Sequence, residues 1–102
     1  MDPTFVFLHV GNEDLPELLI ESIRLTTPTA QIIQCSDPQT TELRGVSRVF
    51  RLSDDTQNLM TFRLACFSKL GLTYPAVYLD ADMLVCRSIS PENLSVRFNK
   101  VL

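Results

Sequence analysis

The stretch TFVFLHV, residues 4–10, decides the fold of this chain. It is almost continuously apolar and rich in aromatic and β-branched residues, with no alternation of apolar and polar positions. A strand that is solvated on one face alternates apolar and polar residues, whereas a strand that is covered on both faces is apolar throughout. The stretch therefore predicts a buried strand in a parallel sheet.

A helix is predicted directly after this strand. Gly11 and Asn12 break the apolar run, and residues 14–17 (DLPE) have the pattern of a capping box with a proline in the first turn. Pro28 lies beyond the expected end of the helix. The apolar residues at helical spacing are Leu15, Leu18, Leu19 and Ile23.

Three further strands and a second helix follow. The strands are predicted at residues 31–35 (QIIQC), 48–52 (RVFRL) and 76–79 (AVYL). Residues 53–55 (SDD) would cap a helix over about 56–70, which Gly71 would end. Parallel strands joined by helical crossovers form a Rossmann-like α/β layer. We therefore expect one domain over residues 1–102, with a mostly parallel sheet and flanking helices.

Composition and charge argue against several classes of protein. The chain has 102 residues, 45% of them hydrophobic, and a formal net charge of -3. It has no Lys/Arg cluster that would bind nucleic acid and no apolar run near the roughly 18 residues of a membrane span. The N-terminal residues lack the features of a signal peptide. Because Cys35, Cys66 and Cys86 fit neither a disulfide framework nor a zinc site, we expect buried thiols and a cytoplasmic protein.

Polar residues lie at the carboxyl ends of three of the predicted strands, within positions 9–12, 36–37 and 80–82. In open parallel sheets, ligands bind beyond the carboxyl ends of the strands, near the switch in strand order. The sequence therefore places polar residues where this fold binds its ligand.

Asp80 and Asp82 are the strongest candidates for a chemical role. They lie in YLDADMLV, residues 78–85, where two carboxylates at the end of a buried strand repel each other and resist desolvation. A divalent cation, Mn²⁺ or Mg²⁺, would relieve both problems because carboxylate oxygens suit these ions. D-x-D alone is a weak motif, and the alternative is a solvated turn in which both acids cap the chain that follows.

Arg63 falls near the middle of the apolar arc of the second predicted helix. A guanidinium on a buried face needs an anionic partner, which the acids after the next strand or a bound phosphate would supply. The alternative is that Arg63 extends to the edge of the domain and reaches solvent. The arc itself consists of Leu59, Phe62, Cys66, Phe67 and Leu70.

His9, Gly11 and Asp37 carry weaker signals. A lone histidine late in an apolar strand is more often a hydrogen-bonded core residue than a base or a ligand. Gly11 indicates a tight turn. Asp37, which precedes a proline, more often forms a turn with its own backbone than binds a ligand.

Three segments together resemble glycosyltransferases of the GT-A fold, and above all the family 8 nucleotide-sugar transferases. PAVYLDADMLVCRSI (75–89) resembles their D-x-D segment, and TFRLACFSKLG (61–71) resembles the helix before it. FVFLHVGNED (5–14) resembles their first strand and its nucleotide-facing turn. The resemblance covers about residues 4–90.

This resemblance implies a site for a nucleotide-diphosphate sugar, with a UDP-sugar as the donor and manganese or magnesium as the cofactor. Asp82 would bind the metal, Asp80 would bind the metal or the ribose, and Arg63 would contact the diphosphate or brace the acids. The metal would bridge the diphosphate and stabilise the leaving group. Val10, Gly11 and Asn12 would lie against the nucleobase. The whole nucleotide-sugar site would comprise Val10, Gly11, Asn12, Asp37, Arg63, Asp80, Ala81 and Asp82.

The sequence departs from the family in its length and its histidines. Family members are much longer, and their second half supplies the acceptor site and a further histidine ligand, whereas this sequence has no histidine after His9. The resemblance therefore predicts the nucleotide-binding half of a hexosyltransferase, with no residue assigned to catalysis. The alternative is a non-catalytic remnant or interaction module of the same fold, which pairs with itself or another chain at an exposed sheet edge.

A haloacid-dehalogenase-like phosphatase is a third class with D-x-D after an apolar strand. It fits less well, because that family has the motif on its first strand and has Thr or Val where this sequence has Leu84.

Overall fold

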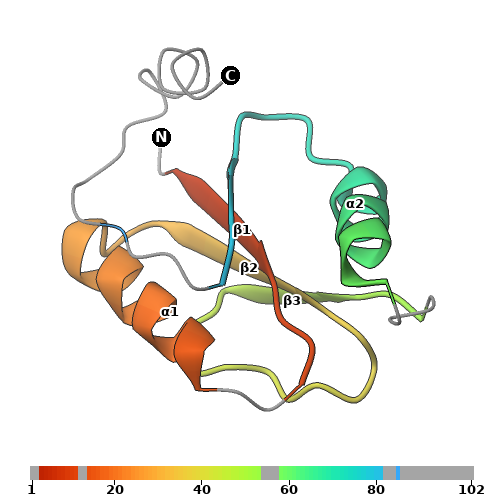
Figure 1. Ribbon diagram of the computed structural model, residues 1–102. Coiled ribbons are helices and arrows are strands. Elements are labelled where there is room, and N and C mark those ends of the chain that lie inside the picture. The colour runs from red at the N-terminus through yellow and green to blue at the C-terminus, as the bar shows by residue number, and fades with distance from the viewer. Residues whose placement is uncertain (1–2, 12–13, 54–57, 82–84, 86–102) are drawn as a thin grey trace.

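A computed structural model describes residues 3–11, 14–53, 58–81 and 85. Its elements are β1 (Thr4–Leu8), α1 (Leu15–Thr26), β2 (Gln31–Ser36), β3 (Arg48–Arg51), α2 (Leu59–Leu70) and β4 (Val77–Leu79). The four strands form one parallel sheet in the order β3-β2-β1-β4 (Figure 1). The predicted α/β class, with a parallel sheet and flanking helices, is confirmed.

The two helices cover opposite faces of the sheet, and the side chains of β1 alternate between them. Phe5 and Phe7 belong to the core cluster beneath α1, whereas Val6 belongs to the cluster beneath α2 (Figure 1). β1 is therefore buried on both faces, as its uninterrupted apolar sequence predicted. The buried helix residues in these clusters are Leu19, Ile20 and Ile23 of α1, and Phe62, Cys66 and Leu70 of α2.

The path of the chain explains why the helices take opposite faces. α1 joins β1 to β2 on one side of β1, whereas α2 carries the chain from β3 back across the sheet to β4, on the other side of β1. Because crossovers between parallel strands are right-handed, crossovers that run in opposite directions place their helices on opposite faces. The strand order consequently switches between β1 and β4.

α1 has its proline in the first turn, and Leu19 and Ile23 are buried, as predicted, but the rest of the predicted stripe and the cap differ from the prediction. Leu15 and Leu18 are 49% and 52% exposed, because a neighbouring stripe at the same helical spacing faces the sheet. Asp14 has a helical backbone (φ −85°, ψ −12°) and its side chain makes no cap hydrogen bond, so the predicted capping box is wrong. The buried residues of α1 are Pro16, Leu19, Ile20 and Ile23.

α2 begins at Leu59, later than predicted, and Asn58 caps it rather than a residue of 53–55. The Asn58 backbone is extended, and its side chain accepts from the Thr61 N–H at 3.2 Å. Residues 54–57 lie outside the described residues. Leu59 is 50% exposed, so its assignment to the buried arc is wrong; it lines a cleft instead. Gly71 ends the helix at φ 62°, as predicted.

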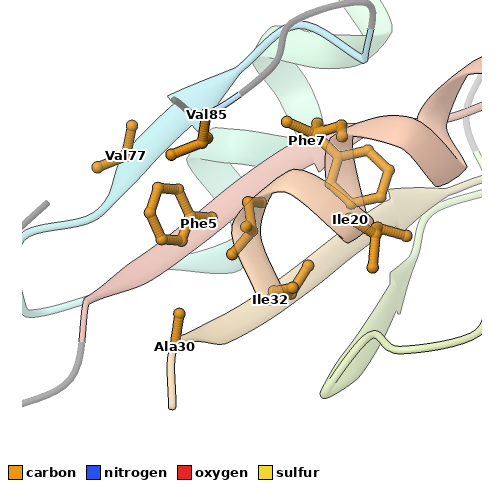
Figure 2. Packing of buried hydrophobic residues seen from close by; sticks show 9 residues of the cluster. Phe5, Phe7, Ile20, Ala30, Ile32, Val77 and Val85 are labelled. Atoms are coloured by element: carbon orange, nitrogen blue, oxygen red, sulfur yellow. The ribbon is translucent and has the colours of Figure 1, made fainter. Parts of the chain in front are cut away.

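Val85 extends the core beneath α1 beyond the end of β4. It is buried in the same cluster as Phe5 and Val77, and Figure 2 shows the three side chains together. Val85 therefore lies on the sheet face that α1 covers.

Cys35 and Cys66 are buried, as predicted, and neither is in a disulfide among the described residues; Cys86 lies outside those residues. Burial raises the pKa of the Cys35 thiol to about 12, which keeps it protonated. In the described part of the chain, the helices are too short or too polar for any of them to cross a bilayer.

Candidate functional site

A cleft opens where the strand order switches, between the carboxyl ends of β1 and β4. The register pairs Phe7 with Leu79, so Leu8 and Asp80 come next on the two strands. Two adjoining hollows, of about 300 and 260 Å³, share Leu8, Leu59 and Ala81 in their walls. We call these two hollows the switch-point cleft. It lies where open parallel sheets bind their ligands.

The larger hollow is mostly apolar. It lies between the end of β1 and the start of α1, and the half-exposed side chains of Leu15 and Leu59 contribute to its wall. Such a surface suits a flat, weakly polar group better than a charged one. The lining residues are Leu8, His9, Val10, Leu15, Pro16, Leu59 and Ala81.

The smaller hollow contains the charged groups of the cleft. Arg63 Nη1 forms an ion pair with Asp80 Oδ1, joining α2 to the end of β4. The two side chains are 33% and 46% exposed, so solvent screens the attraction. The predicted pairing of Arg63 with an acid after the next strand is confirmed for Asp80, whereas Asp82 lies outside the described residues.

The ring of Phe67 packs against the Arg63 guanidinium at the wall of the cleft. Its Cζ lies 5.4 Å from the ring centroid of Phe67, within the range of a cation–π interaction. The Phe67 ring lies 4.7 Å from that of Tyr78 on β4, at an angle of 51°. Burial raises the pKa of Tyr78, so its phenol stays neutral. Arg63 is therefore fixed at the cleft by its own helix and by β4.

A chain of hydrogen bonds joins the segments that follow β1 and β2. The Gly11 N–H donates to Thr40 Oγ1 at 2.9 Å, and the Thr40 hydroxyl donates in turn to Asp37 Oδ1. The Thr40 N–H also donates to Asp37 Oδ1, at 2.9 Å. The hydroxyl bond is the main reason why the pKa of Asp37 lies below its ordinary value of 3.8. Asp37 thus forms the turn that is its commoner role, and it reaches Gly11 through Thr40.

The positions of Gly11 and His9 depend on backbone conformation and backbone hydrogen bonds. Gly11 has φ 113°, a conformation that a side chain would strain, so the glycine is required there. The His9 N–H donates to the Cys35 carbonyl at 2.9 Å, and the His9 carbonyl accepts from Ser36 Oγ at 2.8 Å. His9 is buried, as expected for a core histidine, and it also lines the larger hollow.

Sequence reasoning missed Thr40 and most of the apolar wall. The D-x-x-T spacing of Asp37 and Thr40 was a usable signal, since Asp side chains commonly bond the backbone a few residues on. Leu8, Leu15 and Leu59 carried no such signal, because an apolar residue that lines a cleft looks like a core residue in sequence.

The described residues supply one carboxylate to the predicted metal site. Residues 3–11, 14–53, 58–81 and 85 contain no group of three or more His, Cys, Asp or Glu side chains that could hold a metal ion. Asp80 presents oxygen donors of the kind that manganese and magnesium prefer. Two other residues of the predicted site, Asp82 and Asn12, lie outside the described residues. The metal site therefore stays a prediction.

The chain was also compared with known proteins. No protein-family model matches it, and no curated protein matches it. Its similarity to GT-A glycosyltransferases accordingly rests on the three segments quoted above.

Proposed function

We propose that this chain is the nucleotide-binding half of a GT-A-type glycosyltransferase, which binds a UDP-sugar together with a divalent cation. The position of the Arg63–Asp80 ion pair supports this proposal most strongly. It lies at the strand-order switch of a parallel sheet, in a cleft whose other half is apolar. A nucleotide-sugar has the matching division, with a flat base at one end and a diphosphate in the middle.

Each part of the cleft has a task in this proposal. The apolar hollow, which Val10 lines, receives the nucleobase, and Gly11 comes next in the segment that follows β1. Arg63 binds diphosphate oxygens, for which a guanidinium is well suited. Asp80 and Asp82 hold the cation, which supplies charge neutralisation at the diphosphate leaving group when it is bound.

Asp37 and Asn12 complete the proposed site. Asp37 acts indirectly in this proposal. Its carboxylate accepts a hydrogen bond from the Thr40 hydroxyl, whose oxygen accepts one from the Gly11 N–H. Asn12 follows Gly11 and faces the nucleotide by the family resemblance. No residue is assigned to acceptor binding or to proton transfer.

Variants of the two acids test this function. We expect calorimetric titration of UDP in the presence of manganese to show binding that Asp80→Asn and Asp82→Asn both weaken severely, since each removes a carboxylate from the cation. Glu21→Gln, on the exposed side of α1, is the matched control for loss of one negative charge. Unchanged UDP affinity in Asp82→Asn would overturn the proposal.

A non-catalytic interaction module is the second candidate, and the two edge strands favour β4 as its docking edge. β3 carries Arg48 and Arg51, and charges of this kind discourage edge-to-edge pairing. β4 consists of Val77, Tyr78 and Leu79, and of the described strands it pairs with β1 alone. Light scattering over a dilution series tests this candidate, because a strict monomer at every concentration would argue against pairing with itself.

A further inference from the structure

His9 is a buried polar residue to which the proposed function gives no task. It is 5% exposed, and hydrogen bonds to Cys35 and Ser36 hold its backbone on both sides. Its imidazole, in contrast, makes no hydrogen bond with any described residue. Because buried polar side chains are nearly always hydrogen-bonded, an imidazole in this position indicates a partner that is not part of the described chain.

The ring nitrogens of His9 border open space. Among the described residues, only Thr27 has a side-chain nitrogen or oxygen that is fully enclosed and lacks a hydrogen bond. His9 lines two hollows: the larger hollow of the switch-point cleft, and a third hollow of about 240 Å³ that extends to the β2–β3 connection. A small molecule can therefore reach the imidazole, although the residue is almost completely buried.

The two hollows differ in the ligands that they suit. The third hollow is charged, and its lining includes Arg44 and the three acids Asp14, Glu17 and Glu42. In the larger hollow, by contrast, His9 supplies the only polar side chain among the lining residues. One polar group in an apolar pocket determines how a flat ligand lies, because the polar edge of the ligand finds a hydrogen bond only there.

We propose that His9 is a specificity-determining residue of the proposed nucleotide site, where its imidazole forms a hydrogen bond with the polar edge of the nucleobase. This inference rests on the proposed function, which places the base in the larger hollow. The faces of the base pack against apolar side chains such as Leu15 and Leu59, and its carbonyl and N–H groups face the two ring nitrogens. Because the backbone of His9 is already held, little conformational freedom is lost when the ring binds the base.

Two variants and two ligands test this role. His9→Phe keeps a flat ring without its nitrogens, and Thr41→Val removes a hydroxyl from a residue that lines the third hollow but not the larger one. The ligands are UDP and inorganic diphosphate, which has no base. Their dissociation constants are measured by calorimetry with manganese, well below the melting temperature of each variant.

We expect His9→Phe to weaken UDP binding by about threefold to tenfold, the range that the loss of one hydrogen bond implies. Its affinity for diphosphate should equal that of the unmodified chain, because Arg63 rather than His9 binds the phosphates in the proposed site. Thr41→Val should bind both ligands as the unmodified chain does. A merely structural His9 would instead lower the affinities for UDP and diphosphate together.

The unmodified chain offers a second test that requires no substitution. His9 is the only histidine in the sequence, so the ¹⁵N resonances of its ring can be assigned without ambiguity. Magnesium replaces manganese in this experiment, because manganese broadens nearby resonances. UDP should shift the resonance of at least one ring nitrogen, whereas inorganic diphosphate should shift neither. Unchanged ring resonances at saturating UDP would overturn the inference.

The contrary outcomes separate this inference from the proposed function. If the unmodified chain binds UDP and His9→Phe binds it equally well, the role of His9 is overturned and the proposed function stands. If Thr41→Val loses as much UDP affinity as His9→Phe, the base occupies the third hollow and the inference fails. If the unmodified chain binds no UDP with either cation, the proposed function fails and the role of His9 fails with it.

Discussion

Replacing Arg63 with glutamine should affect the binding of the cation and of the nucleotide in opposite directions. In the free protein, the Arg63 guanidinium is paired with the Asp80 carboxylate. A cation that binds Asp80 must weaken this ion pair or displace it. The diphosphate, in contrast, gains a charged donor from Arg63 in the proposed complex. Arg63→Gln therefore removes a competitor of the cation and a ligand of the nucleotide at once.

The exposure of the two side chains sets the size of the first effect. Because they are 33% and 46% exposed, the ion pair belongs with surface pairs. Surface pairs contribute about 0.2–1 kcal/mol, which corresponds to roughly 1.4-fold to fivefold in affinity. Manganese alone should bind Arg63→Gln more tightly by this factor. UDP in the presence of manganese should bind more weakly by roughly 10-fold to 150-fold, the equivalent of about 1.5–3 kcal/mol for hydrogen bonds to a charged group.

Electron paramagnetic resonance of free manganese measures the first constant, and calorimetry measures the second. Lys69→Gln is the matched control, since it removes one positive charge from the last turn of the same helix. The difference in manganese affinity should also shrink at high salt, because salt screens exposed charges. If Arg63→Gln bound manganese less tightly than the Lys69→Gln control, Arg63 would support the cation site rather than compete with it, and the reasoning would be refuted.

Three further predictions concern the stability of the fold. Gly45→Ala should lower the free energy of unfolding by about 1–3 kcal/mol in thermal melts, because φ is +95° and the new Cβ would lie 2.9 Å from Ile20 Cγ2; unchanged stability would contradict this. Gln34→Leu should cost about 2–4 kcal/mol in urea unfolding, because this fully buried amide bonds the β2–β3 connection through both its oxygen and its nitrogen; a loss below the error of the measurement would contradict it. Thr40→Val removes the hydroxyl that lowers the pKa of Asp37. A lowered pKa in the folded state stabilises the protein above 3.8, and this stabilisation is lost as pH falls through the folded pKa. The stability gap between Thr40→Val and the unmodified chain should therefore be larger at neutral pH than in acid, and an equal gap at both would contradict the reasoning.

Hydrophobic periodicity was sufficient to predict the sheet. The run that contains Phe5, Val6 and Phe7 has no polar alternation because one helix covers each face of β1. The same argument held for β2, which is also buried. The bounds were less accurate: β1 ends at Leu8, two residues earlier than predicted, and the end of β2, the end of β3 and the start of β4 each differ by one residue. Element order and parallel pairing followed from these runs.

The buried side of α1 and the helix caps were predicted less accurately than the sheet. On α1, Leu19 and Ile23 face the sheet as their spacing predicted, whereas Leu15 and Leu18 are about half exposed. Ile20 is buried instead, because neighbouring stripes share the helical spacing and packing against the sheet decides between them. A cap depends on one backbone conformation, which the sequence does not determine: Asp14 has the residue type of a cap but a helical backbone.

The charged part of the site was predictable, whereas its apolar part was not. Arg63 was conspicuous because a guanidinium within an apolar arc requires a partner, and Asp80 is that partner. Leu59 was assigned to the core because nothing in a sequence distinguishes an apolar residue that faces a cleft from one that faces a sheet. Polar residues in apolar surroundings thus indicate a site in the sequence, whereas the apolar residues that line it are identified only from the structure.

The most direct test of a cation-dependent nucleotide site is calorimetric titration of UDP into the unmodified chain, first with manganese and then with a chelator. We predict saturable binding with manganese that the chelator abolishes. A folded chain that gives no heat of binding in either condition, or that binds UDP equally well after chelation, would contradict the proposal that Asp80 and Asp82 hold a cation for a nucleotide-sugar.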